Sequence, residues 1–434
     1  MIKEPLINRI NFIMENTFVF SLRAVAALLV IILLPGCLKD KTTHTYSIYT
    51  PVYKTNAEVR ANIKSNSSKE VSNPGKLFIR GNYIFLNEVD KGIHIIDNSN
   101  PASPKNISFI DIPGNMDLAV KGNILYADLY TDLVAIDIAD PLHIAVKNIV
   151  DNAFPERRYT NGFVSDPSKI IVDWLKKDTT VTEDNAGGRI LLSSCANCMM
   201  ADFLAASPQA SKAASPFGMG GSMARFSIVS NSLYTVNESM LNVYSITVPE
   251  SPVSVNKLSI GFGIETIFPF KDKLFIGSSS GVFIYDIANQ SSPSRIGQFS
   301  HVTACDPVVA DEKNAFVTLS SGTRCSNASN QLDVLDISSL TSPTLVKTYA
   351  MTNPHGLSKD GNSLFICDGT AGLKVYDATD VKDLKLKTNI KGFETYDVIA
   401  YNNVAIVVAR DGLFQYDYSN MDNIKLLSRI GWAN

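Results

Sequence analysis

The sequence has little charge and no block of charge of one sign. Charged residues make up 19% of its 434 residues, and the formal net charge is −3 at neutral pH. Lys and Arg are dispersed along the chain and form no basic run. A protein that binds nucleic acid needs a basic patch or stripe to neutralise phosphates. The composition therefore argues against nucleic acid as the main partner.

The sequence motifs that mark common catalytic sites are also missing. The five histidines stand apart from one another, and neither H-x-H nor H-E-x-x-H occurs. There is no GK[ST] phosphate loop and no dinucleotide-binding fingerprint. One G-x-S-x-G match, residues 277–281, falls in an expected hairpin, whereas a hydrolase nucleophile needs a strand-to-helix turn. The sequence therefore predicts no catalytic residue, and whether the protein is an enzyme stays open, with a non-enzyme favoured.

From Lys76 to Ile430 the chain lacks a sustained helical period, and a different repeat takes its place. Its clearest copy is NPHGLSKDGNSLFICDGTAGLKVYD, residues 353–377. Each copy holds four short strands rich in Val, Ile, Phe and Tyr, separated by turn residues. Most copies lie about 40 residues apart, the spacing of four-stranded propeller blades. We therefore predict an all-β fold, a seven-bladed β-propeller; six or eight blades are the alternatives if the third copy is divided differently.

Two positions in the repeat have a structural explanation. An Asp ends the third strand of most copies, where its carboxylate can accept hydrogen bonds from turn amides, and Ser245 replaces it in the third copy. A Gly opens several of these strands, which suits a hairpin position with positive φ. The aspartates are Asp97, Asp137, Asp286, Asp336, Asp377 and Asp417, and the glycines are Gly92, Gly281, Gly372 and Gly412.

The period breaks once, after the second blade. We place blade one at residues 76–112, blade two at 117–149, and an irregular insertion at residues 151–222. The insertion contains an amphipathic, Trp-containing run at residues 170–177, a C-x-x-C pair and the stretch GMGGS at residues 218–222. Loops of this length in a compact domain are usually functional or disordered. We expect the insertion to act as a lid or as a partner platform on one face.

The N-terminus resembles a bacterial lipoprotein leader. Residues 24–34 form an apolar run of about eleven residues after scattered positive charges, which is too short for a spanning helix. The run ends in LPGC, residues 34–37, which resembles a lipobox. That resemblance implies acylation of Cys37 and stable anchoring by several acyl chains. We expect a signal segment at 1–37, a polar tether at 38–73 and the propeller domain at 74–434, with residues 45–53 able to add a strand to a blade edge.

The residue pattern of the repeat resembles that of a known family. LVAID at residues 133–137, GIHIIDNSNPASP at 92–104 and GLKVYD at 372–377 resemble the LVIVD repeat. That repeat occurs in lipoproteins of Bacteroidetes-type bacteria that are predicted to be extracytoplasmic β-propellers. The resemblance implies a fold and a location in the cell envelope. We expect that location to be the outer membrane, facing the periplasm or the exterior, and the resemblance implies no chemistry. No WD dipeptide ends the third strands, which disfavours the WD-repeat class.

The remaining cysteines fall into three groups. Cys305 and Cys325 flank strand-like segments of the longest blade, and an oxidising envelope would permit a disulfide between them; free thiols are the alternative. Cys195 and Cys198 lack the further ligands of a zinc site and the βαβ context of a redox pair, so their state stays open between a local disulfide and two thiols. Cys367 lies in an apolar strand and is expected to be a core residue.

One set of polar residues is the candidate site. Each copy places a polar residue at or near the start of its innermost strand, and in a propeller these starts converge on one mouth of the central channel. Such a ring could bind a polar ligand or a cation, and a channel-bound divalent ion is compatible with it although no cofactor is predicted. The alternative is a solvated, salt-bridged channel lining. The residues are Lys76, Asp117, Arg225, Glu265 or Thr266, Asp306, His355 and Asp397.

Three functions remain open on the sequence. The leading expectation is a non-enzymatic binding or scaffolding lipoprotein of the cell envelope, partnered by an envelope protein or a polar small molecule. The alternative is a metal-assisted hydrolase or lactonase-like enzyme, with Asp117, Asp306 and Asp397 as metal ligands and His355 as a ligand or base. The third is an envelope structural protein without a small-molecule site.

Overall fold

The structure is a computed structural model that describes residues 41–155, 169–184, 219–300, 307–321 and 330–432. The chain divides into two compact units, one around strands β1 (Lys41–Lys54) and β11 (Ile170–Asp184) and one that contains the repeats from Tyr53 onward. The signal segment with Cys37 lies outside the described residues, and so do Cys195, Cys198, Cys305, Cys325 and Asp306. The predictions made for those residues therefore remain predictions. Within the described residues, no helix is both long enough and apolar enough to cross a membrane.

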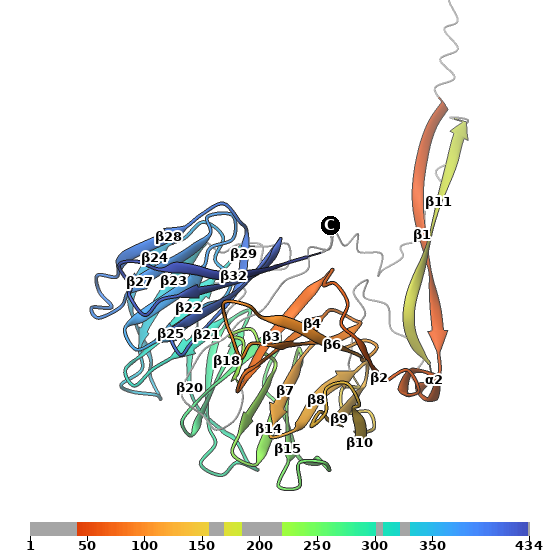
Figure 1. Ribbon diagram of the computed structural model, residues 1–434, viewed down its shortest axis with the longest axis horizontal. Coiled ribbons are helices and arrows are strands. Elements are labelled where there is room, and N and C mark those ends of the chain that lie inside the picture. Colours follow the sequence, from red (N-terminus) through yellow and green to blue (C-terminus); the bar gives the residue numbers. More distant parts are fainter. Residues whose placement is uncertain (1–40, 156–168, 185–218, 301–306, 322–329, 433–434) are drawn as a thin grey trace, which may run out of the picture. The chain divides into compact units, whose positions relative to one another are not determined.

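The compact unit that contains the repeats is a seven-bladed β-propeller, as predicted. Each blade contains four consecutive antiparallel strands (Figure 1). Blades one to three are β3 (Pro74–Arg80), β4 (Tyr83–Glu88), β5 (Gly92–Asp97) and β6 (Lys105–Asp111); β7 (Leu118–Lys121), β8 (Ile124–Leu129), β9 (Asp132–Asp137) and β10 (Ala145–Val150); and β13 (Phe226–Val229), β14 (Ser232–Val236), β15 (Met240–Ser245) and β16 (Val253–Ser259).

The remaining four blades follow in order without a long interruption. They are β17 (Ile264–Phe270), β18 (Lys273–Ser278), β19 (Gly281–Asp286) and β20 (Ser294–Ser300); β21 (Val308–Ala310), β22 (Asn314–Leu319), β23 (Gln331–Asp336) and β24 (Thr344–Ala350); β25 (Leu357–Asp360), β26 (Ser363–Cys367), β27 (Leu373–Asp377) and β28 (Lys385–Ile390); and β29 (Thr395–Tyr401), β30 (Val404–Ala409), β31 (Gly412–Asp417) and β32 (Lys425–Gly431).

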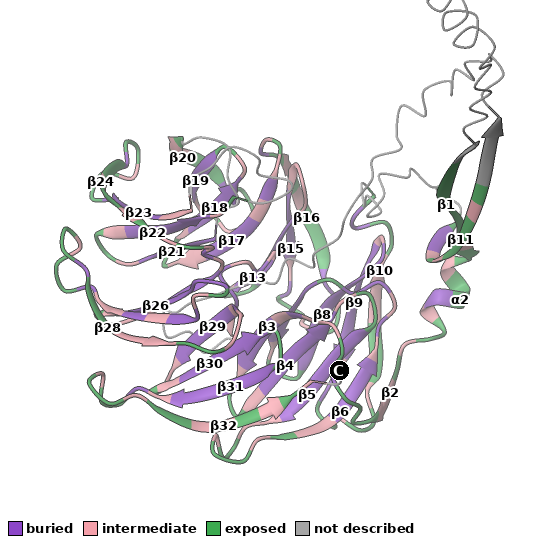
Figure 2. Ribbon diagram, turned by 90° about the horizontal axis from the view of Figure 1, so that it is seen from above, coloured by how far each residue is buried: buried purple, intermediate pink, exposed green. Residues whose placement is uncertain are grey.

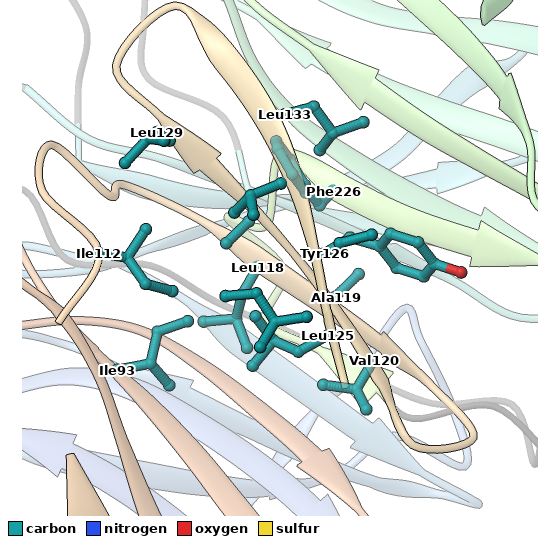
Figure 3. Close-up of a cluster of buried hydrophobic side chains, with 14 of the residues drawn as sticks. Ile93, Ile112, Leu118, Ala119, Val120, Leu125, Tyr126, Leu129, Leu133 and Phe226 are labelled. Atoms are coloured by element: carbon teal, nitrogen blue, oxygen red, sulfur yellow. The ribbon is translucent and has the colours of Figure 1, made fainter. Parts of the chain in front are cut away.

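The core lies between blades, because a single four-stranded sheet cannot bury both of its faces alone. The inner and middle strands are mostly buried, whereas outer strands such as β24 and β28 contain no buried residue (Figure 2). One cluster joins blades one, two and three: Ile93, Leu125 and Phe226 all belong to it (Figure 3). Blade stacking is therefore what buries the apolar strands of each repeat.

Blades seven and one close the ring. Ile399 and Leu413 of blade seven share one buried cluster with Leu77 of blade one. Two side-chain hydrogen bonds cross the same junction: Gln415 Nε2 donates to Asn98 Oδ1 at 2.6 Å, and Ser428 Oγ donates to the Pro101 carbonyl at 2.6 Å. The last blade thus contacts the first as the other neighbouring blades contact each other.

The repeated aspartates form the turns that the sequence predicts. In each of the six copies a carboxylate oxygen accepts the amide of the residue two positions later, for example Ser338 N to Asp336 Oδ1 at 2.8 Å. Ser245 instead shares a 3.1 Å hydroxyl–hydroxyl hydrogen bond with Thr247. These amide bonds are the physical reason for Asp at this position. The other five acceptors are Asp97, Asp137, Asp286, Asp377 and Asp417.

The repeated glycines follow the prediction with one exception. Gly92, Gly281 and Gly372 have φ values of 148°, 146° and 87°. A Cβ at Gly92 would also lie 1.9 Å from the Ile110 carbonyl oxygen of the neighbouring strand. The prediction of a positive φ was wrong for Gly412, which is not among the residues with positive φ. Its Cβ would lie 2.7 Å from the Ile430 oxygen, so close backbone approach explains this glycine.

Blade one carries two additional strands, one on each edge. β2 (Lys64–Ser67) pairs with the outer strand β6, and β12 (Met219–Gly220) pairs with the innermost strand β3. Between Thr55 and β2 lies a short helix, α2 (Asn56–Arg60), which has a capping box and buries Val59 in the core. Part of the expected tether, from α2 to β2, is therefore packed on the propeller.

The expected edge strand at residues 45–53 pairs elsewhere. β1 and β11 form a separate two-stranded antiparallel ribbon (Figure 1), and Ser47 Oγ donates to Asp178 Oδ1 at 2.6 Å across it. The prediction that residues 45–53 join a blade edge was wrong, and β2 occupies that edge instead. The described part of the insertion is also regular, because residues 170–177 belong to a 15-residue strand.

Candidate functional site

The predicted ring residues that the structure describes lie at or near the start of the innermost strands. Lys76 and Asp397 are the third residues of β3 and β29, and Asp117 and Arg225 directly precede β7 and β13. Glu265 and Thr266 are the second and third residues of β17, and His355 lies two residues before β25. Since innermost strands of adjacent blades are neighbours, these positions face one end of the channel.

A segment from the end of the insertion crosses that end of the channel. We call Met219–Arg225 the channel segment. Gly221 N donates to the Leu77 carbonyl of blade one at 3.1 Å, and Ile267 N of blade four donates to the Ala224 carbonyl at 2.8 Å. Leu357 N of blade six approaches Ser222 Oγ at 3.4 Å, and Ser222 is fully buried. Only a segment near the propeller axis can contact blades one, four and six together.

Asp117 fixes the end of the channel segment to blade two. Its carboxylate accepts the amide of Leu118 at 2.7 Å through Oδ1 and the amide of Arg225 through Oδ2. The side chain is 2% exposed. Burial raises the pKa of Asp117 to about 6, although the Lys76 ammonium and the two amides oppose that rise. Asp117 is therefore a buried carboxylate whose oxygens are both occupied.

Lys76 and Arg225 supply the positive charge of the cluster. Lys76 Nζ donates to the Met223 carbonyl of the channel segment at 2.6 Å, and Arg225 Nε donates to the Glu265 carbonyl at 3.3 Å. Burial lowers the pKa of Lys76 to about 8, while the charges of Asp117, Asp397 and Glu265 counteract that effect and Arg225 adds to it. Five of the predicted residues thus form one interacting electrostatic cluster.

Asp397 is the least satisfied member of this cluster. Its side chain is completely buried, and neither carboxylate oxygen has a hydrogen-bond partner. Burial raises the pKa of Asp397 well above its ordinary value, the Asp117 charge adds to the rise, and Lys76 opposes it. An ionised carboxylate without partners is costly in a protein interior. The carboxyl group therefore needs a proton or a positive partner.

The side chain of His355 has partners outside this cluster. Its Nε2 lies 3.1 Å from Asn353 Nδ2, and its ring stands edge-on to Tyr396 at 5.9 Å. Burial lowers the pKa of His355, and the charges that oppose this are Glu394 and Asp368. The structure places His355 at the expected strand end but does not pair its imidazole with Asp117 or Asp397.

Sequence reasoning missed a second layer of buried acids that hold the loops in place. Asp128 Oδ1 accepts the amides of Met116 and Asp117 at 2.8 and 2.9 Å, and so positions the start of β7. Asp368 accepts the Asn353 amide at 2.8 Å and pairs with Lys374 at 2.5 Å. Asp128 is the last residue but one of β8, and Asp368 directly follows β26. An acid near the end of a strongly apolar second strand is the signal that could have identified both.

Sequence reasoning also missed the channel segment, although GMGGS contained a hint. A Cβ at Gly220 would lie 3.0 Å from Ala224 Cβ and 3.3 Å from the Phe78 ring. Only a residue without a side chain fits that space comfortably. A glycine-rich stretch just before a blade therefore signals close backbone approach, which here occurs inside the channel.

The described residues contain no group of three or more His, Cys, Asp or Glu side chains arranged to hold a metal ion. The predicted metal set included Asp306, which lies outside those residues, so that prediction remains open. Cys367 is a buried free thiol in β26, as expected for a core residue, and burial together with the Asp397 charge raises its pKa. Residues 277–281 form the β18–β19 hairpin and no strand-to-helix turn.

A separate surface pocket of about 510 Å³ lies at the other end of the innermost strands. Its lining includes Arg80 at the end of β3, Lys121 at the end of β7, and Glu250 between β15 and β16. Lys121 Nζ donates to Asn231 Oδ1 at 2.6 Å, and Asp137 pairs with Lys147 at 3.0 Å. The pocket therefore has charges of both signs, and Lys121 and Asp137 have partners outside its lining.

Comparison with protein families identifies the repeat. The model described as the LVIVD repeat matches residues 73–110, 114–152 and 327–351. These ranges cover blades one and two and part of blade five. The chain therefore contains LVIVD repeats, as its sequence suggested. No curated protein matches the chain.

Several solved structures are similar to the chain at low sequence identity. The computationally designed protein Ika8 is 10% identical, with 84% of this chain and 89% of that chain covered and a TM-score of 0.49. Sqt1 from Saccharomyces cerevisiae is 8% identical, with 86% and 88% covered and a TM-score of 0.49. BamB from Moraxella catarrhalis is 8% identical, with 83% and 96% covered and a TM-score of 0.47.

Proposed function

We propose that this β-propeller is a lipid-anchored binding protein of the cell envelope that presents the β1–β11 ribbon to a protein partner. The observation that carries the proposal is the composition and exposure of that ribbon. Ile48 and Tyr49 are 51% and 53% exposed, and Leu175 on the other strand is 61% exposed. Several large apolar side chains exposed on one small element commonly mark an interaction site.

The ribbon offers a partner both of its faces. Successive side chains of a strand point to opposite faces, so Ile48 and Tyr49 lie on different sides. The sheet has two strands within the part of the chain that the structure describes. A two-stranded ribbon by itself is at best marginally stable in water, and long edge strands are templates for pairing with another chain. Strand addition by a partner would stabilise the ribbon and give affinity through backbone hydrogen bonds.

The proposed anchor supports the same role. Three residues separate Cys37 from Lys41 at the start of β1, so the two lie at most about 14 Å apart along an extended chain. Acylation of Cys37 would therefore hold the ribbon close to the lipid surface, where envelope partners are concentrated. The anchor is tested by labelling cells with palmitate, and the labelled product should disappear in Cys37→Ala.

The partner role is tested by photo-crosslinking in intact cells of the source organism. A photoreactive residue replaces Tyr49, and a discrete crosslinked protein is expected. Adding Ile48→Ser with Leu175→Ser should remove that product. Substitution is preferable to deleting the insertion, since deletion would also remove the channel segment.

Leu345→Ser provides the matched control, because Leu345 is 49% exposed on the outer strand β24. The control should keep the crosslinked product. Crosslinks to lipid alone, or a protein product that persists in the ribbon double variant, would contradict the proposed partner site.

A further inference from the structure

We infer that the channel end of the propeller binds one singly charged cation at Asp397, either an inorganic ion or the ammonium group of a small molecule. The inference goes beyond the proposed function, because it assigns a ligand chemistry to the channel and not to the ribbon. It stands on different residues from the ribbon, so the two can fail independently.

The first step is the state of the Asp397 carboxyl group. Both oxygens are buried and accept no hydrogen bond from the protein. Native proteins pair nearly all buried polar atoms, so a side chain with two unsatisfied oxygens requires an explanation. An adjacent positive charge would satisfy both oxygens at once and favour the ionised form.

The second step is that the neighbouring charged groups already have partners. The two oxygens of Asp117 accept the amides of Leu118 and Arg225. The Lys76 ammonium donates to the Met223 carbonyl, and no ion pair joins it to Asp397. A move of Lys76 to Asp397 would break its bond to the channel segment. Asp397 is thus the acid of this cluster without a committed partner.

The third step is the charge balance. Lys76 and Arg225 contribute two positive charges, and Asp117, Glu265 and Asp397 contribute three negative charges when ionised. The described part of the cluster therefore carries a formal charge of −1 when all five are ionised. One bound positive charge neutralises it.

The charge balance and the available ligands favour a monovalent over a divalent cation. Calcium takes six to eight oxygen ligands, commonly from several carboxylates. The described residues offer no group of three potential metal-binding side chains, and Asp117 is occupied. The nearby Lys76 and Arg225 would also repel a divalent ion more strongly than a monovalent one. A singly charged cation matches one free carboxylate.

The experiment measures thermal unfolding of the full chain at pH 8 and constant ionic strength. Choline chloride, whose cation is too bulky for a buried site, is replaced stepwise by sodium, potassium, ammonium or methylammonium chloride. At least one of these cations should raise the Tm of the wild type progressively with concentration. A rise in Tm with sodium or potassium would indicate an inorganic ion as the ligand, and a rise with ammonium or methylammonium would indicate an ammonium group.

Asp397→Asn should abolish the cation-dependent rise in Tm, while the surface variant Asp411→Asn should keep it. Asp411 is a suitable control because it is an acid of the same blade that pairs with Arg429 at the surface. Equal Tm in choline and in all four cations would overturn the inference. An equal cation-dependent rise in wild type and Asp397→Asn would also overturn it, because the ion would then bind elsewhere.

A measurement on the wild type covers the case in which Asp397→Asn does not fold. In choline, infrared spectra of aspartate-labelled protein recorded as the pH is raised should show a protonated carboxyl band that persists above the range in which ordinary aspartates ionise, because burial raises the pKa of Asp397 well above its ordinary value. The stabilising cation should remove that band. A band that persists at saturating concentrations of every cation would identify Asp397 as a permanently neutral acid and would overturn the inference.

Discussion

Two sets of aspartates in this propeller occupy repeated positions and have opposite environments. The turn aspartates, such as Asp377, lie at the surface and accept turn amides, and the hydrogen bonds from Thr379 lower the pKa of Asp377. The channel aspartates, Asp117 and Asp397, are buried, and burial raises their pKa. The turn carboxylates stabilise the fold in their charged form, whereas the channel carboxylates are costly when charged. The two amides that Asp117 accepts offset its cost, whereas the oxygens of Asp397 have no such partners. A buried acid whose cost brings no structural benefit points to a site.

The largest effect should come from Asp117→Ala. The substitution leaves the amides of Leu118 and Arg225 without their acceptor and removes the negative charge beside Lys76. Breaking such a buried polar group typically costs about 3 kcal/mol. Equilibrium denaturation in urea should show this loss at pH 7. A loss below about 1 kcal/mol would mean that Asp117 does not hold the channel segment.

The next effect concerns pH and Lys76. The pKa of Lys76 is lowered to about 8 from 10.5, so the folded state releases the proton before the unfolded state does. This contribution to stability is present above the unfolded value and is lost as pH falls through the folded value. Wild-type stability should therefore contain a component that rises between about pH 8 and 10.5.

Lys76→Met should remove that component and raise the pKa of Asp117 above about 6, because Lys76 opposes that rise. Denaturation curves collected across this pH range check both effects. Identical pH profiles for wild type and Lys76→Met would place Lys76 outside the buried cluster.

A smaller effect is expected from Asp377→Ala in a surface turn. The variant loses the acceptor of the Thr379 amide, but water can replace it because the turn is exposed. Its Tm should fall by less than that of Asp117→Ala. The pKa of Asp377 is lowered in the folded state, so the stabilisation holds above the ordinary value and disappears as pH falls through the folded value. The difference between the two proteins should therefore vanish in strong acid.

The smallest effect should come from Ser245→Asp, which gives the third copy the common turn residue. The new carboxylate could accept the Thr247 amide, as the aspartates of the other copies accept theirs. We expect a slight rise in Tm at pH 7 that is absent at low pH. A fall in Tm at pH 7 would show that the third blade has a different turn geometry.

The turn aspartates explain how much of the fold could be predicted from the sequence. Asp97, Asp336 and their equivalents depend on local hydrogen bonds two residues away, so their spacing revealed the blades directly. Residues 45–53 were assigned incorrectly because a β-prone segment does not identify its partner strand. β1 pairs with a strand about 130 residues later, for example at Ser47 and Asp178.

The channel cluster was predicted in part. The position of each residue relative to the start of its innermost strand placed Lys76, Asp117 and Asp397 at one end of the channel. The electrostatic coupling of these residues agrees with that placement. The position of His355 in its repeat could not show that its imidazole lies against Asn353 and Tyr396. Side-chain partners depend on loops such as the channel segment, which interrupts the repeat and therefore carries no periodic signal.

The most direct test of this account is the titration of Asp397 and Asp377 in the same protein. Carbon-13 NMR of aspartate-labelled wild type, in choline and with the two signals assigned through Asp397→Asn and Asp377→Asn, measures both groups. We expect Asp397 to titrate well above the ordinary value of 3.8 and Asp377 to titrate below it. Titration of both groups near 3.8 would show that Asp397 is exposed to water and would contradict the buried channel cluster.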